Sequence, residues 1–289
     1  MKRIIFFSSL ILLLFVSLFL YQYIHFNDHR LHVIFCEVGQ GDGIFLRTPS
    51  GKTILVDGGP GKDIEDCLAG HMPFWQRVID LMILSHPHAD HLNGLNRVLK
   101  SYTVRHFVTE PLGNKTMGYK NLIETVKAER VDTHDVLAGE VIRMGDGVVL
   151  HILGPTKAYL ERTSPKGIIG ESAEFGSIIQ VISYGNFDVL LDGDSQVEGM
   201  KQATQGLALR KQIELLQVPH HGSRFGLDEK ILSQLSPKLS VISVGKNNYG
   251  HPSSKTLQLL QQAKVPFMRT DQDGDVEIVS DGRNWWIAK

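Results

Sequence analysis

The sequence predicts a single α/β domain that follows an N-terminal membrane helix. Short apolar runs of strand length alternate with amphipathic helical stretches along residues 31–289. Several of the predicted strands end in a cluster of polar, ligand-type side chains, namely after Leu84, Leu191, Val218 and Val244. When neighbouring strands of one sheet end side by side, their terminal loops share an edge, so residues far apart in the sequence can form one site there.

The composition allows a large core and gives no strong overall charge. The chain has 289 residues, of which 42% are hydrophobic, and its formal net charge is −1. A charge this close to zero excludes recognition of nucleic acid through a global basic field. An anionic substrate would therefore have to be attracted locally, by a metal or by a few lysines and arginines.

The first 26 residues have the pattern of a membrane span. Lys2 and Arg3 precede an uncharged apolar run from Ile4 to Leu20. About 20 apolar residues cross a bilayer, and the basic end stays in the cytoplasm. We interpret residues 1–26 as an uncleaved signal anchor of the cell membrane, with the domain 31–289 on the extracytoplasmic side. A cleaved signal peptide is the alternative, but its apolar segment is usually shorter, about 7–15 residues, and no A-x-A-like cleavage site follows.

The predicted elements follow one another without an obvious linker. Residues 31–38, 44–47 and 53–56 form strands, and Ser50-Gly51 suits a tight hairpin between the last two. The other predicted strands are 78–84, 104–108, 141–152 with a turn at Gly145-Asp146-Gly147, 176–184, 188–191, 212–218, 239–244, 265–269, 276–280 and 284–287. The predicted helices are 92–100, 117–130, 197–209, 228–235 and 254–263, the last with Ser253 as its N-cap. Residues 154–175 are polar and rich in glycine, and we predict a flexible loop, a candidate lid.

Cys36 and Cys67 are the two cysteines of the chain. They form no C-x-x-C pair, so a cysteine-based metal site is not expected. We expect two buried free thiols, with a disulfide as the alternative if the domain is exported.

The loop after the strand 78–84 contains the most informative residues of the chain. It places four ligand-type side chains in six positions: His86, His88, Asp90 and His91. Imidazole nitrogen and carboxylate oxygen are ligands that Zn²⁺ and Mn²⁺ accept. We predict that His86 and His88 converge on one metal, and that Asp90 and His91 reach a second point nearby.

Two later strand ends can complete such a site. Asp194 follows the strand 188–191, and its carboxylate can bridge two cations. His220 follows the strand 212–218 and adds an imidazole, with His221 as its neighbour or substitute. Two divalent ions, Zn or Mn, held in this way would lower the pKa of a shared water and support hydrolysis.

Other polar residues near strand ends have two interpretations each. Asp57 is a turn residue, or a carboxylate that orients the histidine loop. His251 caps its loop, or it contacts the substrate or acts as an acid. Lys246 and Arg224 are surface charges, or they contact an anionic substrate. The catalytic candidates are thus Asp90, His251 and Asp57, and the possible additional site residues are His221, Lys246, Asn247 and Glu174.

The segment LSHPHADHLNGL (84–95), with its H-x-H-x-D-H spacing, resembles the signature of the metallo-β-lactamase superfamily. More narrowly, the chain resembles the hydrolase module of the ComEC competence proteins. The further matching motifs are EVGQGD (37–42), LVDGG (55–59), LLDGD (190–194), LQVPHHGS (216–223) and SVGKNNYGHPS (243–253). This resemblance implies an αββα sandwich with a dinuclear site on one edge. It also implies metal ligation by His86, His88, Asp90, His91, Asp194 and His220, with Asp57 as the supporting carboxylate.

The resemblance further implies a membrane-anchored, metal-dependent hydrolase, most simply a phosphodiesterase that degrades single-stranded DNA outside the membrane. A separate DNA-uptake channel protein would be its partner, because one hydrophobic segment cannot form a channel. The alternative enzyme hydrolyses another exported ester or a lactam. The alternative without catalysis is a surface-exposed binding protein that keeps the fold.

Three positions depart from the pattern of the superfamily. The separate third histidine, expected between His91 and Asp194, has no clear candidate, because the available histidines 106, 134 and 151 lack the usual neighbours. Glu174 stands where this branch often has asparagine, and Gly43 replaces a serine after Gly-Asp. These departures predict a first metal site that is poor in ligands.

Overall fold

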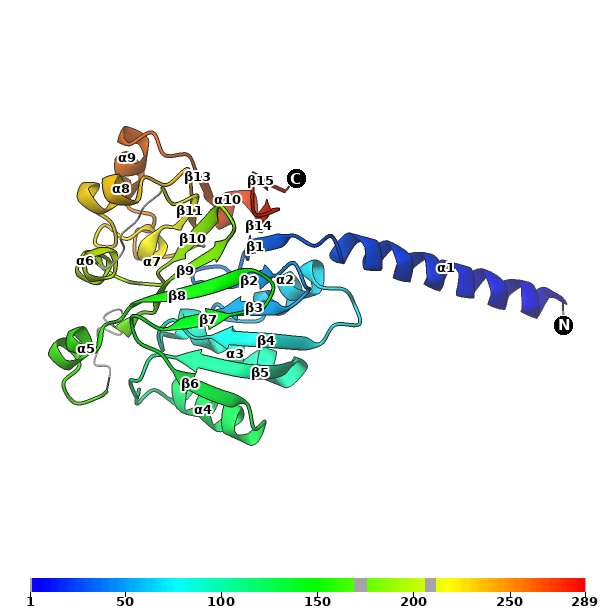
Figure 1. The fold of residues 1–289 in the computed structure, drawn as a ribbon. Helices are drawn as coiled ribbons and strands as arrows, with labels where there is room; N and C mark the ends of the chain where they lie inside the picture. The colour runs from blue at the N-terminus through cyan, green and yellow to red at the C-terminus, as the bar shows by residue number, and fades with distance from the viewer. Residues whose placement is uncertain (1, 169–175, 206–211, 289) are drawn as a thin grey trace.

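The computed structural model describes residues 2–168, 176–205 and 212–288 of the chain. It has two β-sheets packed face to face with helices on the outside, as the sequence predicts (Figure 1). The first sheet has the strand order β15-β14-β1-β2-β3-β4-β5-β6, and the second has the order β13-β12-β11-β10-β9-β8-β7. Helices α2, α3 and α4 pack on the outer face of the first sheet, and α6, α8 and α9 pack on the outer face of the second.

The element boundaries are as follows. The first sheet contains β1 (Leu31–Phe35), β2 (Ile44–Arg47), β3 (Thr53–Val56), β4 (Val78–Ile83), β5 (Thr103–Thr109), β6 (Asp132–Asp135), β14 (Val276–Ser280) and β15 (Trp285–Ile287). The second contains β7 (Val141–Arg143), β8 (Val148–Gly154), β9 (Ile179–Tyr184), β10 (Phe187–Leu191), β11 (Leu215–Gln217), β12 (Leu239–Ile242) and β13 (Phe267–Arg269). The helices are α1 (Lys2–Phe26), α2 (Asp63–His71), α3 (Ala89–Ser101), α4 (Met117–Ala128), α5 (Lys157–Thr163), α6 (Val197–Gln205), α7 (Pro219–Gly222), α8 (Glu229–Leu235), α9 (Ser254–Gln262) and α10 (Thr270–Asp273).

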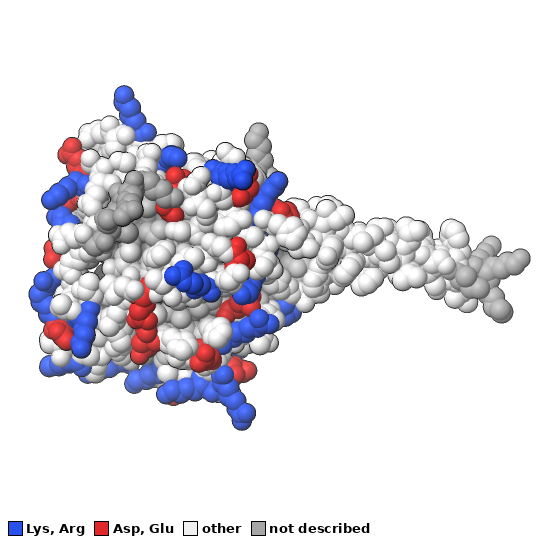
Figure 2. All heavy atoms as spheres, viewed as in Figure 1, with Lys and Arg blue, Asp and Glu red and all other residues white. Residues whose placement is uncertain are grey.

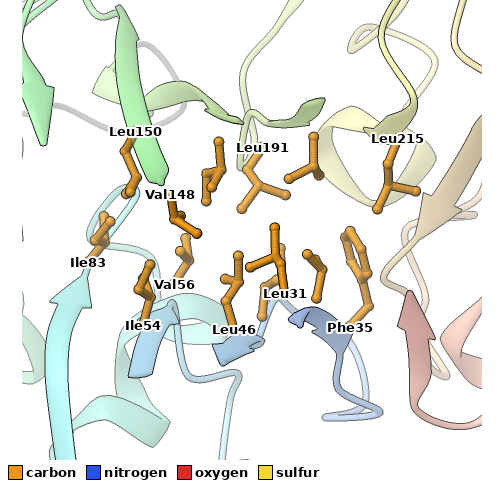
Figure 3. Packing of buried hydrophobic residues seen from close by; sticks show 14 of the residues in the cluster. Leu31, Phe35, Leu46, Ile54, Val56, Ile83, Val148, Leu150, Leu191 and Leu215 are labelled. Carbon is orange, nitrogen blue, oxygen red and sulfur yellow. The ribbon is translucent and has the colours of Figure 1, made fainter. Parts of the chain in front are cut away.

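The main core lies between the two sheets (Figure 3). Leu46 and Ile54 project from the first sheet toward Leu150 and Leu191 of the second, and all four side chains are fully or almost fully buried. Burial of each such side chain contributes about 1.5–3 kcal/mol. This layer fixes the distance between the sheets and therefore the relative position of the loops at their common edge.

The direction of the strands determines which edge of the sandwich carries the candidate site. In the first sheet β3, β4, β5 and β6 run parallel, and in the second sheet β10, β11, β12 and β13 run parallel. The carboxyl ends of β4, β10 and β11 therefore present the histidine loop, Asp194 and the His220-His221 pair at one edge of the sandwich.

Cys36 and Cys67 form a disulfide, with their Cα atoms 5.9 Å apart. The prediction of two free thiols is therefore wrong. Cys36 follows β1, and Cys67 lies in α2, which packs across the outer face of the same sheet. That packing brings together two residues separated by 31 positions, which the spacing of the cysteines alone does not reveal.

Some segments differ from the prediction, and two predicted elements extend beyond the described residues. The predicted loop 154–175 contains the helix α5, which begins at the capping residue Thr156. The strand β6 was not predicted, because its sequence DTHD has no apolar residue and all four residues are exposed. The ends of two predicted elements, the helix 197–209 and the loop that contains Glu174, lie outside the described residues.

Helix α1 extends away from the sandwich (Figure 1). Its segment Phe6–Phe26 has 21 residues and is long and apolar enough to cross a membrane, by length and composition. Figure 2 shows positive and negative side chains interspersed over one face of the domain, whereas the α1 surface from Ile4 onward has no charged residue.

Candidate metal centre

The histidine loop is held at the end of β4 by the packing of α3. His88 is the N-cap residue of α3 and has an extended backbone, with φ −81° and ψ 153°. Asp90 and His91 therefore lie in the first turn of the helix. The apolar face of α3 is buried against the first sheet, which fixes the direction of that turn.

Asp57 orients this loop from the end of β3. Its buried carboxylate accepts hydrogen bonds from the backbone N–H of Ser85 at 2.7 Å and from Ser85 Oγ at 2.6 Å. His91 Nδ1 also donates to Asp57, at 2.8 Å. Because Nδ1 is the donor, His91 Nε2 is left free to face the centre of the cluster. Of the two interpretations of Asp57, the geometry supports the orienting carboxylate.

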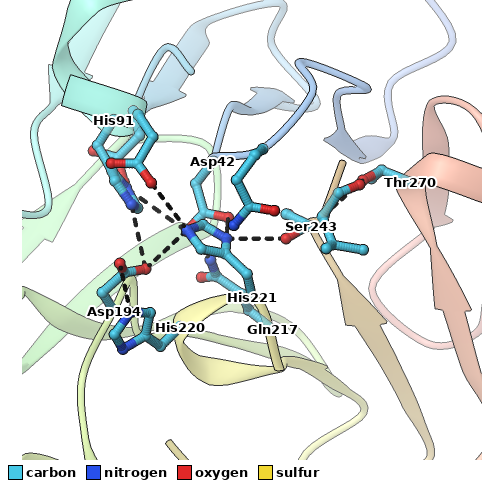
Figure 4. A network of polar contacts seen from close by, with 12 residues as sticks. Asp42, His91, Asp194, Gln217, His220, His221, Ser243 and Thr270 are labelled. Atoms are coloured by element: carbon cyan, nitrogen blue, oxygen red, sulfur yellow. Dashed lines mark hydrogen bonds and ion pairs between the residues drawn. The ribbon is translucent and has the colours of Figure 1, made fainter. Parts of the chain in front are cut away.

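Asp194 lies at the middle of the cluster (Figure 4). Its Oδ1 is 3.2 Å from His91 Nε2 and 3.3 Å from His221 Nε2. Its Oδ2 is 3.5 Å from His220 Nε2 and 3.7 Å from His86 Nε2. Each carboxylate oxygen thus faces its own pair of imidazoles, which is the arrangement a bridging ligand requires.

The second sheet supplies both members of the His220-His221 pair. Both residues have left-handed backbones, with φ 52° and 54°, in the short turn α7 after β11. His221 Nδ1 donates to the carbonyl of Ser243 at 2.9 Å, so its Nε2 faces Asp194 and also lies 3.6 Å from Asp90 Oδ2. Backbone strain of this kind is concentrated at functional sites and points both rings into the cluster.

The cluster has donor atoms for two cations. One group consists of Asp90, His91, Asp194 and His221, and the other of His86, His88 and Asp194. Within each group the ligand atoms lie within 4.8 Å of one another. His91 Nε2, His221 Nε2 and Asp194 Oδ1 are buried and have no hydrogen-bond partner. Leaving such atoms unpaired costs about 1–3 kcal/mol each, and a divalent cation would satisfy all three.

The charges of the site favour a bound cation. Burial raises the pKa of Asp194, but His221 and His91 outweigh it and hold the pKa well below the usual range. Burial also opposes protonation of His221, yet Asp194 and Asp42 raise its pKa well above the usual value. Burial, with His91, lowers the pKa of His86 well below its ordinary value, so this imidazole stays neutral. The Asp194 carboxylate thus attracts either protonated imidazoles or metal ions, and protons and metal ions compete for the ligand atoms around it.

Asp42 is the last residue of the motif EVGQGD (37–42) and was not predicted to belong to the site. In the structure it lies beside His221. It is almost fully buried, accepts a 2.6 Å hydrogen bond from Gln217 Nε2, and lies 3.5 Å from His221 Nδ1. The Gly-Gln-Gly-Asp turn could have indicated this role. An aspartate that closely follows a buried strand is itself expected to be buried, and burial of a carboxylate costs free energy unless it has a partner.

The loop after β12 borders the metal centre. The ring of His251 lies 5.4 Å from that of His220. Asn247 donates to the carbonyls of Gly245 and His251, and its Oδ1 accepts from the backbone of His251. Asn247 therefore shapes the loop that presents His251. Lys246 is exposed on the same loop, and Glu174 lies outside the described residues.

An open cavity of about 560 Å³ adjoins His251. Its lining includes two exposed aromatic side chains, Phe225 and Tyr249, and two exposed basic side chains, Arg224 and Lys255. The guanidinium of Arg224 lies over the Phe225 ring, 4.7 Å from its centre. We call this feature the aromatic groove.

Comparison with known proteins agrees with this architecture. The family model described as "Metallo-beta-lactamase superfamily" matches residues 36–167. The solved metallo-β-lactamase fold protein YhfI from Bacillus subtilis superposes with a TM-score of 0.54, at 11% identity over 82% of this chain and 95% of that chain. Igni18, a metallo hydrolase from Ignicoccus hospitalis, superposes with a TM-score of 0.55, at 12% identity over 85% and 98% of the two chains. The chain thus has the metallo-β-lactamase fold, and the predicted fold class is confirmed.

Two curated relatives are similar over most of the chain. ComE operon protein 3 of Bacillus subtilis is 29% identical in an alignment 265 residues long, and the alignment covers 83% of this chain and 32% of the relative. Recombination protein 2 of Haemophilus influenzae is 27% identical in an alignment 252 residues long, and the alignment covers 84% of this chain and 28% of the relative. The predicted resemblance to competence proteins is confirmed. The chain spans about a third of the length of these relatives.

Proposed function

We propose that this protein is a membrane-anchored, metal-dependent phosphodiesterase that cleaves single-stranded DNA. The observation that carries the proposal is the convergence of buried, unpaired nitrogen and oxygen atoms around Asp194 at the carboxyl edge of both sheets. Two divalent ions bound there would supply a hydroxide at neutral pH and stabilise the charge that develops on a phosphate.

We assign the ligands as two sets that share Asp194. His86, His88 and Asp194 Oδ2 form the first set, and Asp90, His91, His221 and Asp194 Oδ1 form the second. His220 completes the first set, because its Nε2 faces the same carboxylate oxygen as His86. His220 thereby takes the place of the third histidine for which the sequence has no candidate.

The remaining residues prepare these ligands and the substrate. Asp57 holds the orientation of His91, and the Ser243 carbonyl holds that of His221. His251 is half-buried between the metal centre and the aromatic groove, where burial and the neighbouring His220 lower its pKa. We propose that His251 moves a proton at the oxygen that leaves phosphorus.

The aromatic groove favours a nucleic acid strand over another exported ester or a lactam. Exposed aromatic rings can stack on bases, and Arg224 and Lys255 can contact phosphates. Phe225 is 55% exposed and Tyr249 is 77% exposed, so both rings are available. A small apolar pocket would favour the alternative enzyme, and the groove beside His251 is open and partly basic instead.

The disulfide supports an extracytoplasmic location for the domain. Disulfides persist in oxidising compartments and are rare in the cytosol. With α1 as a signal anchor and Lys2-Arg3 at its cytoplasmic end, the domain would lie outside the cell membrane. We propose that the domain works beside a DNA-uptake channel, because the chain is similar to competence proteins over 83–84% of its length.

The test is a metal count combined with two substrates. The full chain is purified from membranes, its bound metal is counted, and cleavage of bis(p-nitrophenyl) phosphate and of single-stranded DNA is followed with added Zn²⁺ or Mn²⁺. We expect two metals per chain and cleavage of both substrates. We further expect that the F225A/Y249A variant loses about tenfold more activity on DNA than on the small diester.

Each other outcome contradicts a separate part of the proposal. A chain that binds no metal would leave a binding protein of this fold as the better interpretation. Cleavage of the small diester alone, with DNA left intact, would indicate a phosphodiesterase for a different substrate. Equal effects of the F225A/Y249A variant on both substrates would remove the groove from the substrate path.

A further inference from the structure

The turn between α2 and β4 carries two aromatic side chains at its tip. The backbone N–H of Gln76 donates to the carbonyl of Pro73 at 2.9 Å, and Phe74 and Trp75 occupy the central positions of this turn. Their rings pack edge to face with centroids 4.9 Å apart. Phe74 remains 43% exposed and Trp75 remains 40% exposed. Adjacent exposed aromatic residues at a turn, where polar residues are usual, indicate an apolar surrounding.

The turn is attached to the side of α1. The ring of Trp75 lies 4.6 Å from that of Phe19, and the ring of Phe74 lies 6.2 Å from that of Phe15. The backbone N–H of Phe74 also donates to the side-chain oxygen of Gln22 at 2.9 Å. The turn therefore has polar and apolar contacts with the same face of the helix.

These contacts place the turn at a definite depth along the candidate span. Tyr21 and Tyr23, both exposed, mark the interfacial part of the helix, because tyrosines are enriched at the membrane–water boundary. Phe19 and Phe15 precede Tyr21 by two and six residues, or about 3 and 9 Å along the helix at 1.5 Å per residue. Aromatic residues that lie this far below the interface are at the boundary between lipid headgroups and acyl chains.

We infer that the Pro73–Gln76 turn inserts into the bilayer beside α1, so that Phe74 and Trp75 contact lipid at the headgroup–acyl boundary. The inference rests on the proposal that α1 is retained as a membrane anchor. Because α1 is exposed from Phe6 to Tyr21, a turn that packs against Phe15 must share the surroundings of that residue. Met72, buried in the core beneath α2, holds the turn rigidly to the domain.

The consequence is a fixed orientation of the domain on the membrane. A domain attached to the membrane by one helix and a short connection can rotate and tilt relative to the membrane surface. A second apolar contact with the bilayer restricts both motions. The turn thus acts as a second attachment point whose ligand is the lipid bilayer itself.

The test uses Trp75 as a fluorescent reporter in the full chain. Trp285 and Trp286, the other tryptophans of the sequence, are replaced in the W285F/W286F variant, which is reconstituted into lipid nanodiscs. Lipids with bromine on the upper part of the acyl chain quench only indoles in contact with them. We expect about twofold lower Trp75 emission in brominated than in plain lipid, and weak quenching by aqueous iodide.

The mass of the reconstituted protein separates the two proposals. If the mass shows that α1 is retained, yet Trp75 is not quenched by brominated lipid and is fully open to iodide, the lipid contact is wrong and the anchor stands. If α1 has been removed from the mature protein, the anchor and the lipid contact both fail. A W75F/W285F/W286F variant provides the background signal for both quenchers.

Discussion

In the described part of the chain, the cluster around Asp194 and a cluster on β5 and β6 both consist of histidine and aspartate, but they differ in setting. His91, His221 and Asp194 are fully or almost fully buried, and the atoms that face one another have no hydrogen-bond partner. In the second cluster, on β5 and β6, the side chains are 52–60% exposed. There Asp132 Oδ2 accepts from His106 Nδ1 and from His134 Nε2, at 3.1 Å each. Both clusters bring their ligand atoms within 4.8 Å of one another.

We expect this difference in setting, rather than ligand type or spacing, to decide which cluster binds a metal. In the buried cluster Asp57 and the Ser243 carbonyl bind the Nδ1 atoms and leave the Nε2 atoms directed inward. In the exposed cluster water competes for every ligand atom, and such exposed pairs contribute little energy. Burial and a second layer of hydrogen bonds therefore distinguish a prepared site from a chance grouping.

The largest expected effect is that of D194A. Asp194 faces both imidazole pairs, so its removal takes a ligand from each proposed metal. We expect loss of both metals and at least about a thousandfold lower cleavage of bis(p-nitrophenyl) phosphate. Metal analysis and steady-state kinetics measure this, with circular dichroism to establish that the variant folds. A folded D194A protein with both metals bound would refute the bridging role.

The second effect is that of D57N, which keeps the shape of the side chain and removes its charge. The amide cannot accept all three hydrogen bonds from Ser85 and His91, so His91 loses its fixed orientation. We expect about 10–100-fold weaker metal binding. Competition with a chelator of known affinity measures the change. Unaltered affinity would mean that burial alone prepares the site.

Glu110 is a buried carboxylate like Asp194, but acidic side chains rather than imidazoles are the charged groups that act on it. Burial raises its pKa well above the ordinary value, and one of its oxygens has no hydrogen-bond partner. Because the folded state binds this proton more tightly than the unfolded state, wild-type stability is highest below the ordinary pKa and falls as the pH rises through the raised pKa. We expect E110Q to lack this fall.

The measurement for Glu110 is the difference in Tm between E110Q and wild type as a function of pH. The difference should be near zero at about pH 4 and increase toward neutral pH, by about 2–4 °C for each kcal/mol. A difference that is constant with pH would show that Glu110 has the same pKa in the folded and unfolded states, so that burial does not raise it.

The smallest effect is expected for H106A/H134A. Its side chains are exposed and their hydrogen bonds are replaceable by water, so metal content and metal affinity should change by less than about twofold. Metal titration of this variant beside wild type is the measurement. Loss of one bound metal would break the comparison, because it would show that exposed ligands of the right type are enough.

The sequence revealed the parts of the site that are local. The histidine loop could be predicted because four ligand-type residues occupy six adjacent positions after an apolar strand. Asp194 followed from the same reasoning at another strand end. The sequence predicted His220 as the ligand, with His221 as its neighbour or substitute. It could not show that both rings face Asp194, because this depends on left-handed backbones in α7 and on the Ser243 carbonyl from a neighbouring strand.

Long-range packing explains what the sequence did not reveal. The disulfide requires α2 to lie across β1, and nothing in the spacing of the cysteines determines that crossing. The contribution of Asp42 depends on contacts with Gln217 and His221, which are far away in the sequence. The fold class, by contrast, follows from local patterns and motif order, and was predicted correctly.

Strand β4 connects the two functional ends of this molecule. The aromatic turn precedes it and the histidine loop follows it (Figure 1). Its six residues, at about 3.3 Å each, make a rigid spacer about 20 Å long. If the turn inserts into lipid, the length of β4 determines the distance between the bilayer and the proposed metal centre. The phosphates of the lipid headgroups would then lie too far from the proposed metal centre to be cleaved. A single strand of DNA would reach the centre only in the aqueous space beyond the membrane surface.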